Sequence, residues 1–224
     1  MRFDIITIFP DIFDSYFNES IIKRARVKKL IDIRVHNLRK FSRDKHKKVD
    51  DKPYGGGPGM VLKIEPIVMA LGSISRNKKQ ETRNKTLVVL FSAAGKQFSQ
   101  KMARDFSKKY EKIVMICGHY EGVDERVKKV IHDLGFMLQE VSIGPYVLTG
   151  GELPAMVMVD AVSRQIPGVL GKSESLEEKR YGVGVPVYTR PEVVVYKGKK
   201  YHTPEILICG DHKKIEKWRT NNLR

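Results

Sequence analysis

Glycines and prolines interrupt an apolar run in residues 142–156, which read Ser-Ile-Gly-Pro-Tyr-Val-Leu-Thr-Gly-Gly-Glu-Leu-Pro-Ala-Met. Because Gly144, Gly150 and Gly151 lack Cβ and tolerate positive φ, the backbone there can turn sharply and lie against a flat ligand. Residues 152–164 follow with the spacing of an amphipathic helix. A glycine-lined loop that leads into a helix is typical of nucleotide-type sites, and a structural bend is the alternative on the pattern alone.

The elements that must position this loop are short apolar runs that alternate with helical patterns. Five runs predict strands, and two segments with helical spacing of their apolar residues predict helices. Strand, helix and strand in succession indicate an α/β fold with a mainly parallel sheet. The predicted strands are residues 3–9, 31–35, 87–91, 113–117 and 136–141, and the predicted helices are residues 99–110 and 122–132.

The composition points to a polyanionic partner. The 224 residues include 42 basic and 26 acidic side chains, a net charge of +16, and nucleic acid is the usual partner of so basic a surface. No amphipathic basic helix, lipidation signal or long uncharged span favours a membrane. Asp4 and Pro10 argue against a signal peptide, and two cysteines make no disulfide framework, so we expect a cytoplasmic protein.

The composition changes towards the C-terminus. We expect residues 1–165 to form the main domain, residues 166–184 a polar linker, and residues 185–224 a small C-terminal domain with a helix near 211–221. About forty residues cannot bury much of a core alone, so the C-terminal domain should pack against another surface.

The chain resembles the bacterial tRNA (guanine-N1)-methyltransferases, a family of the SPOUT class. The resemblance implies a trefoil knot in the C-terminal part of the α/β fold and a homodimer. It also implies methylation of guanosine N1 at tRNA position 37 by S-adenosylmethionine, and a helical C-terminal domain that is shortened relative to the family. It rests on residues 44–60, 117–126, 142–156, 167–172, 188–192 and 217–219, which occur in the family's order.

The resemblance implies a set of cofactor-binding residues in the glycine-rich loop and two neighbouring segments. Pro145 departs from the family's aspartate and removes both a carboxylate and a backbone donor. Mg²⁺ is implied as an aid to activity without a dedicated cage, so no metal residues are assigned. The implied cofactor-binding residues are Phe91, Ser92, Gly118, Glu121, Ser142, Ile143, Gly144, Pro145, Tyr146, Val147, Leu148, Gly150, Gly151 and Pro154.

Methyl transfer to a ring nitrogen of guanine needs aligned reactants, a base for the N1 proton and a cation near O6. By resemblance, Arg164 is the cation and Glu121 is a functional carboxylate beside the methyl donor. The structural alternatives are an ion pair between Arg164 and Asp160 and a helix N-terminal charge for Glu121.

The family's proposed base, a linker aspartate, aligns with Lys179, which is normally charged at neutral pH and cannot accept a proton. A small shift of the linker could bring either Glu177 or Glu178 to the guanine, and Glu178 is the favoured replacement, although residues 175–178 also match a capping box that opens a helix. Two alternative functions therefore stay open, namely methylation of another RNA nucleotide and RNA binding without catalysis. Residues 54–60 have the glycine content of an anion cradle or of a rigid loop.

Overall fold

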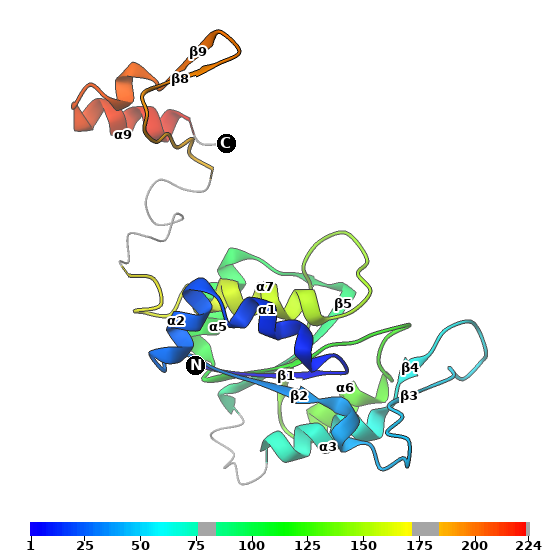
Figure 1. Cartoon of the computed structure of the whole chain (residues 1–224). Coiled ribbons are helices and arrows are strands. Elements are labelled where there is room, and N and C mark those ends of the chain that lie inside the picture. Colours follow the sequence, from blue (N-terminus) through cyan, green and yellow to red (C-terminus); the bar gives the residue numbers. More distant parts are fainter. Residues whose placement is uncertain (76–83, 172–183, 223–224) are drawn as a thin grey trace. The chain divides into compact units, whose positions relative to one another are not determined.

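The structure is a computed structural model that describes residues 1–75, 84–171 and 184–222, and the chain divides into two compact units, Met1–Val169 and Leu170–Arg224. The first unit is built on a five-stranded parallel sheet with the strand order β2-β1-β6-β5-β7 (Figure 1). The predicted α/β class and mainly parallel sheet are confirmed. The strands are β1 (Arg2–Thr7), β2 (Asp32–Asn37), β5 (Thr86–Gln97), β6 (Lys112–Ile116) and β7 (Met137–Ser142).

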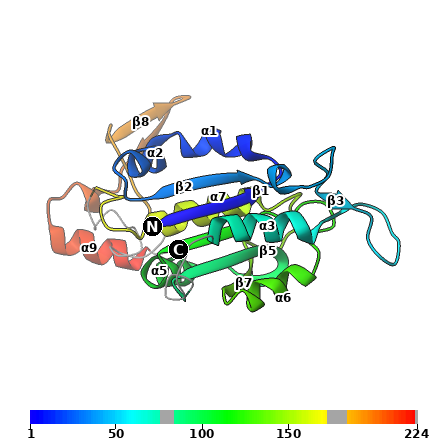
Figure 2. The same ribbon diagram turned by 90° about the horizontal axis from the view of Figure 1, so that it is seen from below.

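Helices cover both faces of this sheet (Figure 1, Figure 2). Because neither face meets water, the strands are apolar on both sides: Phe3 and Ile5 of β1 pack into one core, and Ile6 packs into the other. One face carries α1 (Asp14–Phe17), α2 (Ser20–Val27), α5 (Gln100–Lys109) and α7 (Glu152–Ser163), and the other carries α3 (Ile64–Ser75) and α6 (Arg126–Asp133). Shorter elements are η1 (Pro10–Phe13), η2 (Leu38–Phe41) and the hairpin of β3 (Asp50–Asp51) with β4 (Val61–Leu62).

Two predicted boundaries are wrong in a way that matters for the site. The helix expected from residue 122 begins at Arg126, because Gly122 has φ +121° and its carbonyl accepts a 3.0 Å hydrogen bond from Leu62 N–H. Strand β5 continues beyond Phe91 to Gln97, with a register shift against β7 between Phe91 and Lys96.

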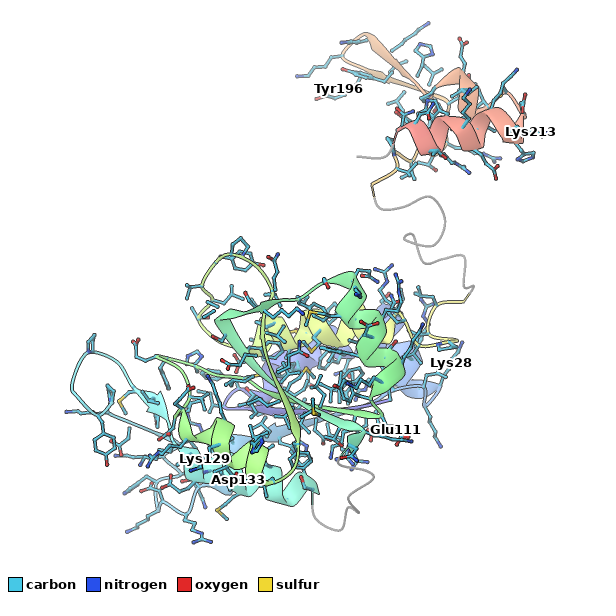
Figure 3. All side chains as sticks on the ribbon, turned by 180° about the vertical axis from the view of Figure 1, so that it is seen from behind. Lys28, Glu111, Lys129, Asp133, Tyr196 and Lys213 are labelled. Carbon is cyan, nitrogen blue, oxygen red and sulfur yellow. The ribbon has the colours of Figure 1, made fainter. Side chains whose placement is uncertain are left out.

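The second unit holds the antiparallel hairpin of β8 (Val193–Tyr196) with β9 (Lys199–His202), followed by η4 (Glu205–Leu207) and α9 (His212–Asn221). The predicted C-terminal helix is confirmed. The Asp211 side chain caps α9 by accepting hydrogen bonds from the N–H groups of Lys213 and Lys214. Figure 3 shows Tyr196 on the hairpin and Lys213 on the helix at the surface of this unit.

A buried carboxylate ties three neighbouring strands of the sheet together. Asp4 of β1 has no exposed surface, and its Oδ1 lies 2.7 Å from both Arg2 and His36 Nε2. Lys112 Nζ of β6 lies 3.4 Å from the other carboxylate oxygen. Burial raises the pKa of Asp4, but the hydrogen bonds from His36 and Arg2 and the charge of Lys112 outweigh it, so the pKa is lowered overall.

We expect Asp4→Ala to destabilise the protein by about 3–5 kcal/mol, because it leaves the buried ammonium group of Lys112 without its counter-charge. The pKa of Asp4 is lowered in the folded state, so its contribution is present above the unfolded-state pKa and is lost as the pH falls through the folded-state pKa. Urea unfolding at pH 7 and at acidic pH measures both effects. The control is Asp32→Ala, which removes a surface pair with Arg34 and should cost less than about 1 kcal/mol; equal losses would refute the account.

Candidate functional site

A cavity of about 320 Å³ lies against the middle of β5 and at the carboxyl ends of β6 and β7, next to the start of α7. Ligands of open parallel sheets bind in this position, because neighbouring loops diverge there and leave a crevice. The residues that line it fall within three segments far apart in the sequence, residues 90–93, 118–128 and 140–154.

Most of the predicted cofactor-binding residues line this one cavity. Gly144 and Pro145 belong to the same loop but are not among the lining residues, and Pro145 is exposed. The proline that replaces the family's aspartate therefore stands outside the cavity wall. The predicted residues that do line it are Phe91, Ser92, Gly118, Glu121, Ser142, Ile143, Tyr146, Val147, Leu148, Gly150, Gly151 and Pro154.

Gly150 and Gly151 are needed for close packing. Gly151 N–H donates a 2.9 Å hydrogen bond to the Gly118 carbonyl, which draws the loop onto the segment after β6. A Cβ on Gly151 would lie 2.6 Å from Cys117 Cα, and one on Gly150 would lie 2.7 Å from His119 Nδ1. Gly151 has φ −84°, and Gly144 and Gly150 are not among the glycines with positive φ, so none of the three is required for a left-handed conformation.

Glu121 stands in a turn at the cavity wall, five residues before α6 begins, so its alternative interpretation as a helix N-terminal charge is wrong. Its N–H donates a 3.0 Å hydrogen bond to the Met60 carbonyl. Its carboxylate packs on Gly59, where an added Cβ would lie 2.3 Å from Oε1. Glu121 therefore joins the glycine-rich segment 54–60 to the cavity.

Arg164 is not brought to the cavity within one chain. It follows the last residue of α7, about 18 Å along the helix axis from Glu152 at the 1.5 Å rise of an α-helix. Asp160 accepts a 2.5 Å hydrogen bond from the Tyr16 hydroxyl. Burial and this bond raise the pKa of Tyr16 to about 12, and the nearby positive charge of Arg164 acts in the opposite direction. Glu178 and Lys179 lie outside the described residues.

Two buried groups behind the loop were not predicted from sequence. Glu152 is 5% exposed and accepts a 2.7 Å hydrogen bond from Thr7 Oγ1 across 145 positions of sequence. Burial, together with the charge of Glu152, raises the pKa of the Cys117 thiol well above its ordinary value. Cys117 is thus a buried packing residue whose thiol resists ionisation. The sequence feature that could have indicated Glu152 is a single carboxylate at the start of an otherwise apolar helical segment.

The described parts of the chain contain no group of three or more His, Cys, Asp or Glu side chains that could hold a metal ion. Within the same residues, none of the helices has the length and apolar character needed to cross a membrane.

A parallel sheet with helices on both faces and a glycine-lined cavity at its strand ends defines an α/β protein of the type that binds nucleotide-like ligands. The chain belongs to the family described as tRNA (Guanine-1)-methyltransferase TrmD, whose profile matches residues 1–224.

Individual relatives agree with this assignment. A protein of Dictyoglomus turgidum named tRNA (guanine-N(1)-)-methyltransferase is 50% identical over 222 residues, which cover 98% of this chain and 83% of the relative. A protein of Clostridioides difficile with the same name is 47% identical, with 98% of this chain and 90% of the relative covered. One of Carboxydothermus hydrogenoformans, named alike, is 46% identical, with coverages of 98% and 81%.

Proposed function

We propose that this protein transfers a methyl group from S-adenosylmethionine to N1 of guanosine 37 in tRNA. The observation that carries the proposal is the glycine-lined cavity at the strand ends of a chain that belongs to the tRNA (Guanine-1)-methyltransferase family over its whole length. The net charge of +16 suits a polyanionic substrate. The cytoplasm is the expected compartment for an enzyme that modifies tRNA.

The cavity fits S-adenosylmethionine in size and in the nature of its walls. Its volume of about 320 Å³ is within the range of small-molecule sites. Gly150 and Gly151 lack the Cβ that would meet His119 and Cys117, so the loop can lie directly on the segment after β6 and form one wall of the cavity. When bound there, S-adenosylmethionine supplies an activated methyl group on its sulfonium sulfur.

The protein's own residues have three tasks in this reaction. The loop of residues 142–151 aligns the reactants and keeps water away from them. Arg164 stabilises the negative charge that develops on guanine O6 as N1 loses its proton. Glu178 is our proposed base, in place of the family aspartate that aligns with Lys179, and Glu121 supports the donor at the cavity wall.

We propose a homodimer in which Arg164 of one subunit completes the site of the other. About 18 Å of helix separates Arg164 from the loop of its own chain, so the reaction needs a second copy. The same face of the unit exposes apolar side chains: Leu153 and Val157 of α7 are 54% and 45% exposed, and Phe9 and Ile12 are 43% and 44% exposed. When two copies pack about a two-fold axis through this patch, the apolar side chains of each copy cover those of the other.

The finer features of the fold are also proposals. We propose a trefoil knot in the C-terminal part of the main domain. The pairing of His119 with Gly150, which brings the loop of residues 142–151 back onto the segment after β6, supports it. We assign residues 1–165 to cofactor binding and catalysis, residues 166–184 to a linker, and residues 185–224 to tRNA binding.

Transfer of a labelled methyl group from S-adenosylmethionine to tRNA transcripts tests this function. We expect incorporation into a transcript with guanosine at position 37 and only background incorporation when that position is adenosine. Equal labelling of both transcripts would move the target to another nucleotide. Tight tRNA binding with no labelling would make the protein an RNA-binding relative without catalysis.

A further inference from the structure

A buried hydroxyl and a buried carboxylate meet behind the proposed cofactor cavity. Thr7 is the last residue of β1 and has no exposed surface, and Glu152 is the first residue of α7 and is 5% exposed. Thr7 Oγ1 donates a hydrogen bond of 2.7 Å to Glu152 Oε1. Neither residue lines the cavity, so neither contacts a ligand bound in it.

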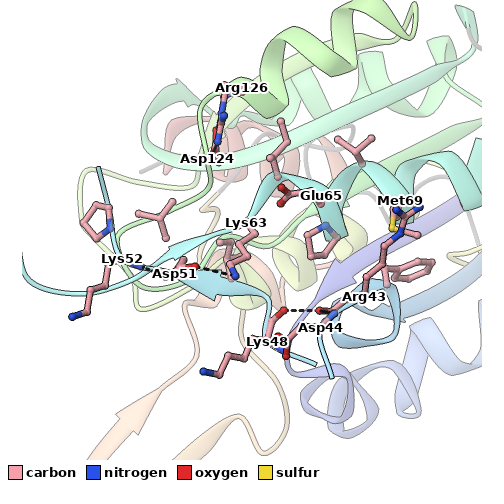
Figure 4. A pocket seen from close by; sticks show the side chains of 18 of the residues that line it. Arg43, Asp44, Lys48, Asp51, Lys52, Lys63, Glu65, Met69, Asp124 and Arg126 are labelled. Carbon is pink, nitrogen blue, oxygen red and sulfur yellow. Dashed lines mark hydrogen bonds and ion pairs between the residues drawn. The ribbon is translucent and has the colours of Figure 1, made fainter. Parts of the chain in front are cut away.

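Glu152 differs from the exposed carboxylates of the protein because no cation lies beside it. In the open cavity of about 1,190 Å³ between residues 41–54 and α3, for example, Asp51 pairs with Lys63 at 3.0 Å (Figure 4). Glu152 forms no ion pair with any other described residue. The amino-terminal end of α7 favours a negative charge there, and the Thr7 hydroxyl supplies the hydrogen bond that a buried carboxylate needs.

The Thr7 hydroxyl has a fixed orientation. Its oxygen accepts a 2.9 Å hydrogen bond from Phe9 N–H, while its proton is directed at Glu152. The branched Cβ of threonine restricts rotation about χ1, and the side chain is fully buried. The two hydrogen bonds therefore fix the first turn of α7 relative to the end of β1.

The loop of residues 142–151 depends on its two ends for its position. Residues 145–149 in its middle are all exposed, so little packing holds them. The first end of the loop is the last residue of β7. At the second end, Gly151 N–H donates a 2.9 Å hydrogen bond to the Gly118 carbonyl, and Glu152 follows directly. The hydrogen bond to Glu152 is therefore a second anchor at this end.

The position of Glu152 also affects the cavity wall. The two atoms nearest to the place of a Cβ on Gly150 are Glu152 Oε2 and His119 Nδ1. Gly150 and His119 both line the cavity, and their backbones pair with each other. His119 Nδ1 is buried and has no hydrogen-bond partner among the residues that the structure describes. A shift of the Glu152 carboxylate would therefore displace two residues of the wall.

We propose that Thr7 is a positioning residue for the cofactor site: its hydroxyl holds the carboxylate of Glu152, and Glu152 holds the loop of residues 142–151 against the segment after β6. This assignment rests on the proposed function, since it takes the loop as part of the S-adenosylmethionine site. Thr7 acts through Glu152 and touches no reactant, so its loss should weaken cofactor binding and leave the chemical step nearly intact.

The test compares the parent protein with Thr7→Val, which removes the hydroxyl, and with Thr7→Ser, which keeps it. We expect Thr7→Val to raise both the Kd for S-adenosylhomocysteine and the KM for S-adenosylmethionine roughly tenfold, the size of one hydrogen bond to a charged group. The kcat at saturating S-adenosylmethionine should stay within about twofold of the parent value. Thr7→Ser should restore Kd and KM to within about threefold, because its hydroxyl can still donate to Glu152.

The matched control is Thr86→Val. Thr86 is the first residue of β5, is 3% exposed and does not line the cavity. This variant also removes a buried threonine hydroxyl from a strand of the same sheet, and it should leave Kd and KM at the parent values. Equal increases in Thr7→Val and Thr86→Val would show a general effect of lost stability and would overturn the assignment, as would a parent-like Kd in Thr7→Val.

A double-mutant cycle with Glu152→Gln tests whether Thr7 acts through Glu152. The amide of this variant can still accept the hydroxyl proton but carries no charge, so adding Thr7→Val to it should raise the cofactor Kd only about threefold. The double variant leaves no unpaired carboxylate in the interior, so it keeps the test decisive if Thr7→Val alone does not fold. Equal cofactor affinities of Glu152→Gln and the double variant would contradict a role of Thr7 through residue 152.

Amide hydrogen exchange without cofactor separates this assignment from the proposed function. The N–H groups of Gly151 and Ala155, bonded to the carbonyls of Gly118 and Gly151, should exchange on the order of tenfold faster in Thr7→Val, while those of β6 exchange as in the parent. Unchanged exchange at Gly151 and Ala155 would overturn the positioning role. If the parent binds neither S-adenosylmethionine nor S-adenosylhomocysteine, the proposed function fails, and the exchange rates still decide whether Thr7 holds the loop.

Discussion

Arg164→Ala is expected to lower the turnover number for tRNA methylation on the order of a hundredfold or more, while the affinity for S-adenosylmethionine stays nearly unchanged. The size follows from the loss of one preorganised donor aimed at a developing oxyanion. The cofactor is spared because the proposed target of Arg164 is the guanine, and Arg164 is not among the residues that line the cofactor cavity of its own chain. Single-turnover kinetics and calorimetry measure the two quantities separately.

A mixing experiment with Arg164→Ala tests whether the arginine acts across subunits. Combined with a Gly151→Ala subunit, it can form a mixed dimer in which one of the two sites has both its loop and its arginine intact. At an S-adenosylmethionine concentration far below the Kd of the Gly151→Ala variant, where neither component alone has much activity, we therefore expect activity to return, up to about a quarter of the parent value for random pairing. If the mixture stays as inactive as its components although the subunits exchange, the site lies within one chain.

Gly151→Ala is expected to weaken cofactor binding roughly tenfold to hundredfold. The added Cβ would lie 2.6 Å from Cys117 Cα, a backbone atom that cannot turn aside, so the loop must move off the segment it packs against. Overpacking of this kind costs about 1–3 kcal/mol. Calorimetry with S-adenosylmethionine measures the affinity, and thermal unfolding shows whether the variant is folded.

The matched control for this change is Gly72→Ala on α3. A Cβ on Gly72 meets no atom within 4 Å beyond its own helix, and alanine is the better helix former, so this variant should bind the cofactor normally. A folded Gly151→Ala protein with the affinity of the parent would remove the loop of residues 142–151 from the cofactor site.

The sheet could be predicted from sequence because parallel strands buried on both faces read as continuous apolar runs. The end of β5 could not be predicted, because residues 92–97 are small or polar. Strand β5 resumes its pairing with β7 only after the register shift, at Lys96 and Gln97. The start of α6 was placed too early, because the pattern of residues 122–132 does not show that Gly122 bonds to Leu62 instead of entering the helix.

The resemblance singled out a set of residues most of which line one cavity, but it did not give their geometry. The contact of Thr7 with Glu152 and the packing of Gly151 on Cys117 depend on strand order, which no local pattern encodes. The position of Arg164 could not be predicted either. The sequence places Arg164 on the helix that starts at the cavity, but only the length of that helix shows that Arg164 lies at the end away from the cavity.

Nucleoside analysis of tRNA after incubation with the protein and S-adenosylmethionine tests the central claim most directly. Digestion, chromatography and mass spectrometry separate N1-methylguanosine from guanosines methylated on N2, N7 or the ribose. The account predicts N1-methylguanosine, located at position 37 and strongly reduced with Arg164→Ala. A different methylated nucleoside, or unmodified tRNA with cofactor and tRNA both bound, would contradict it.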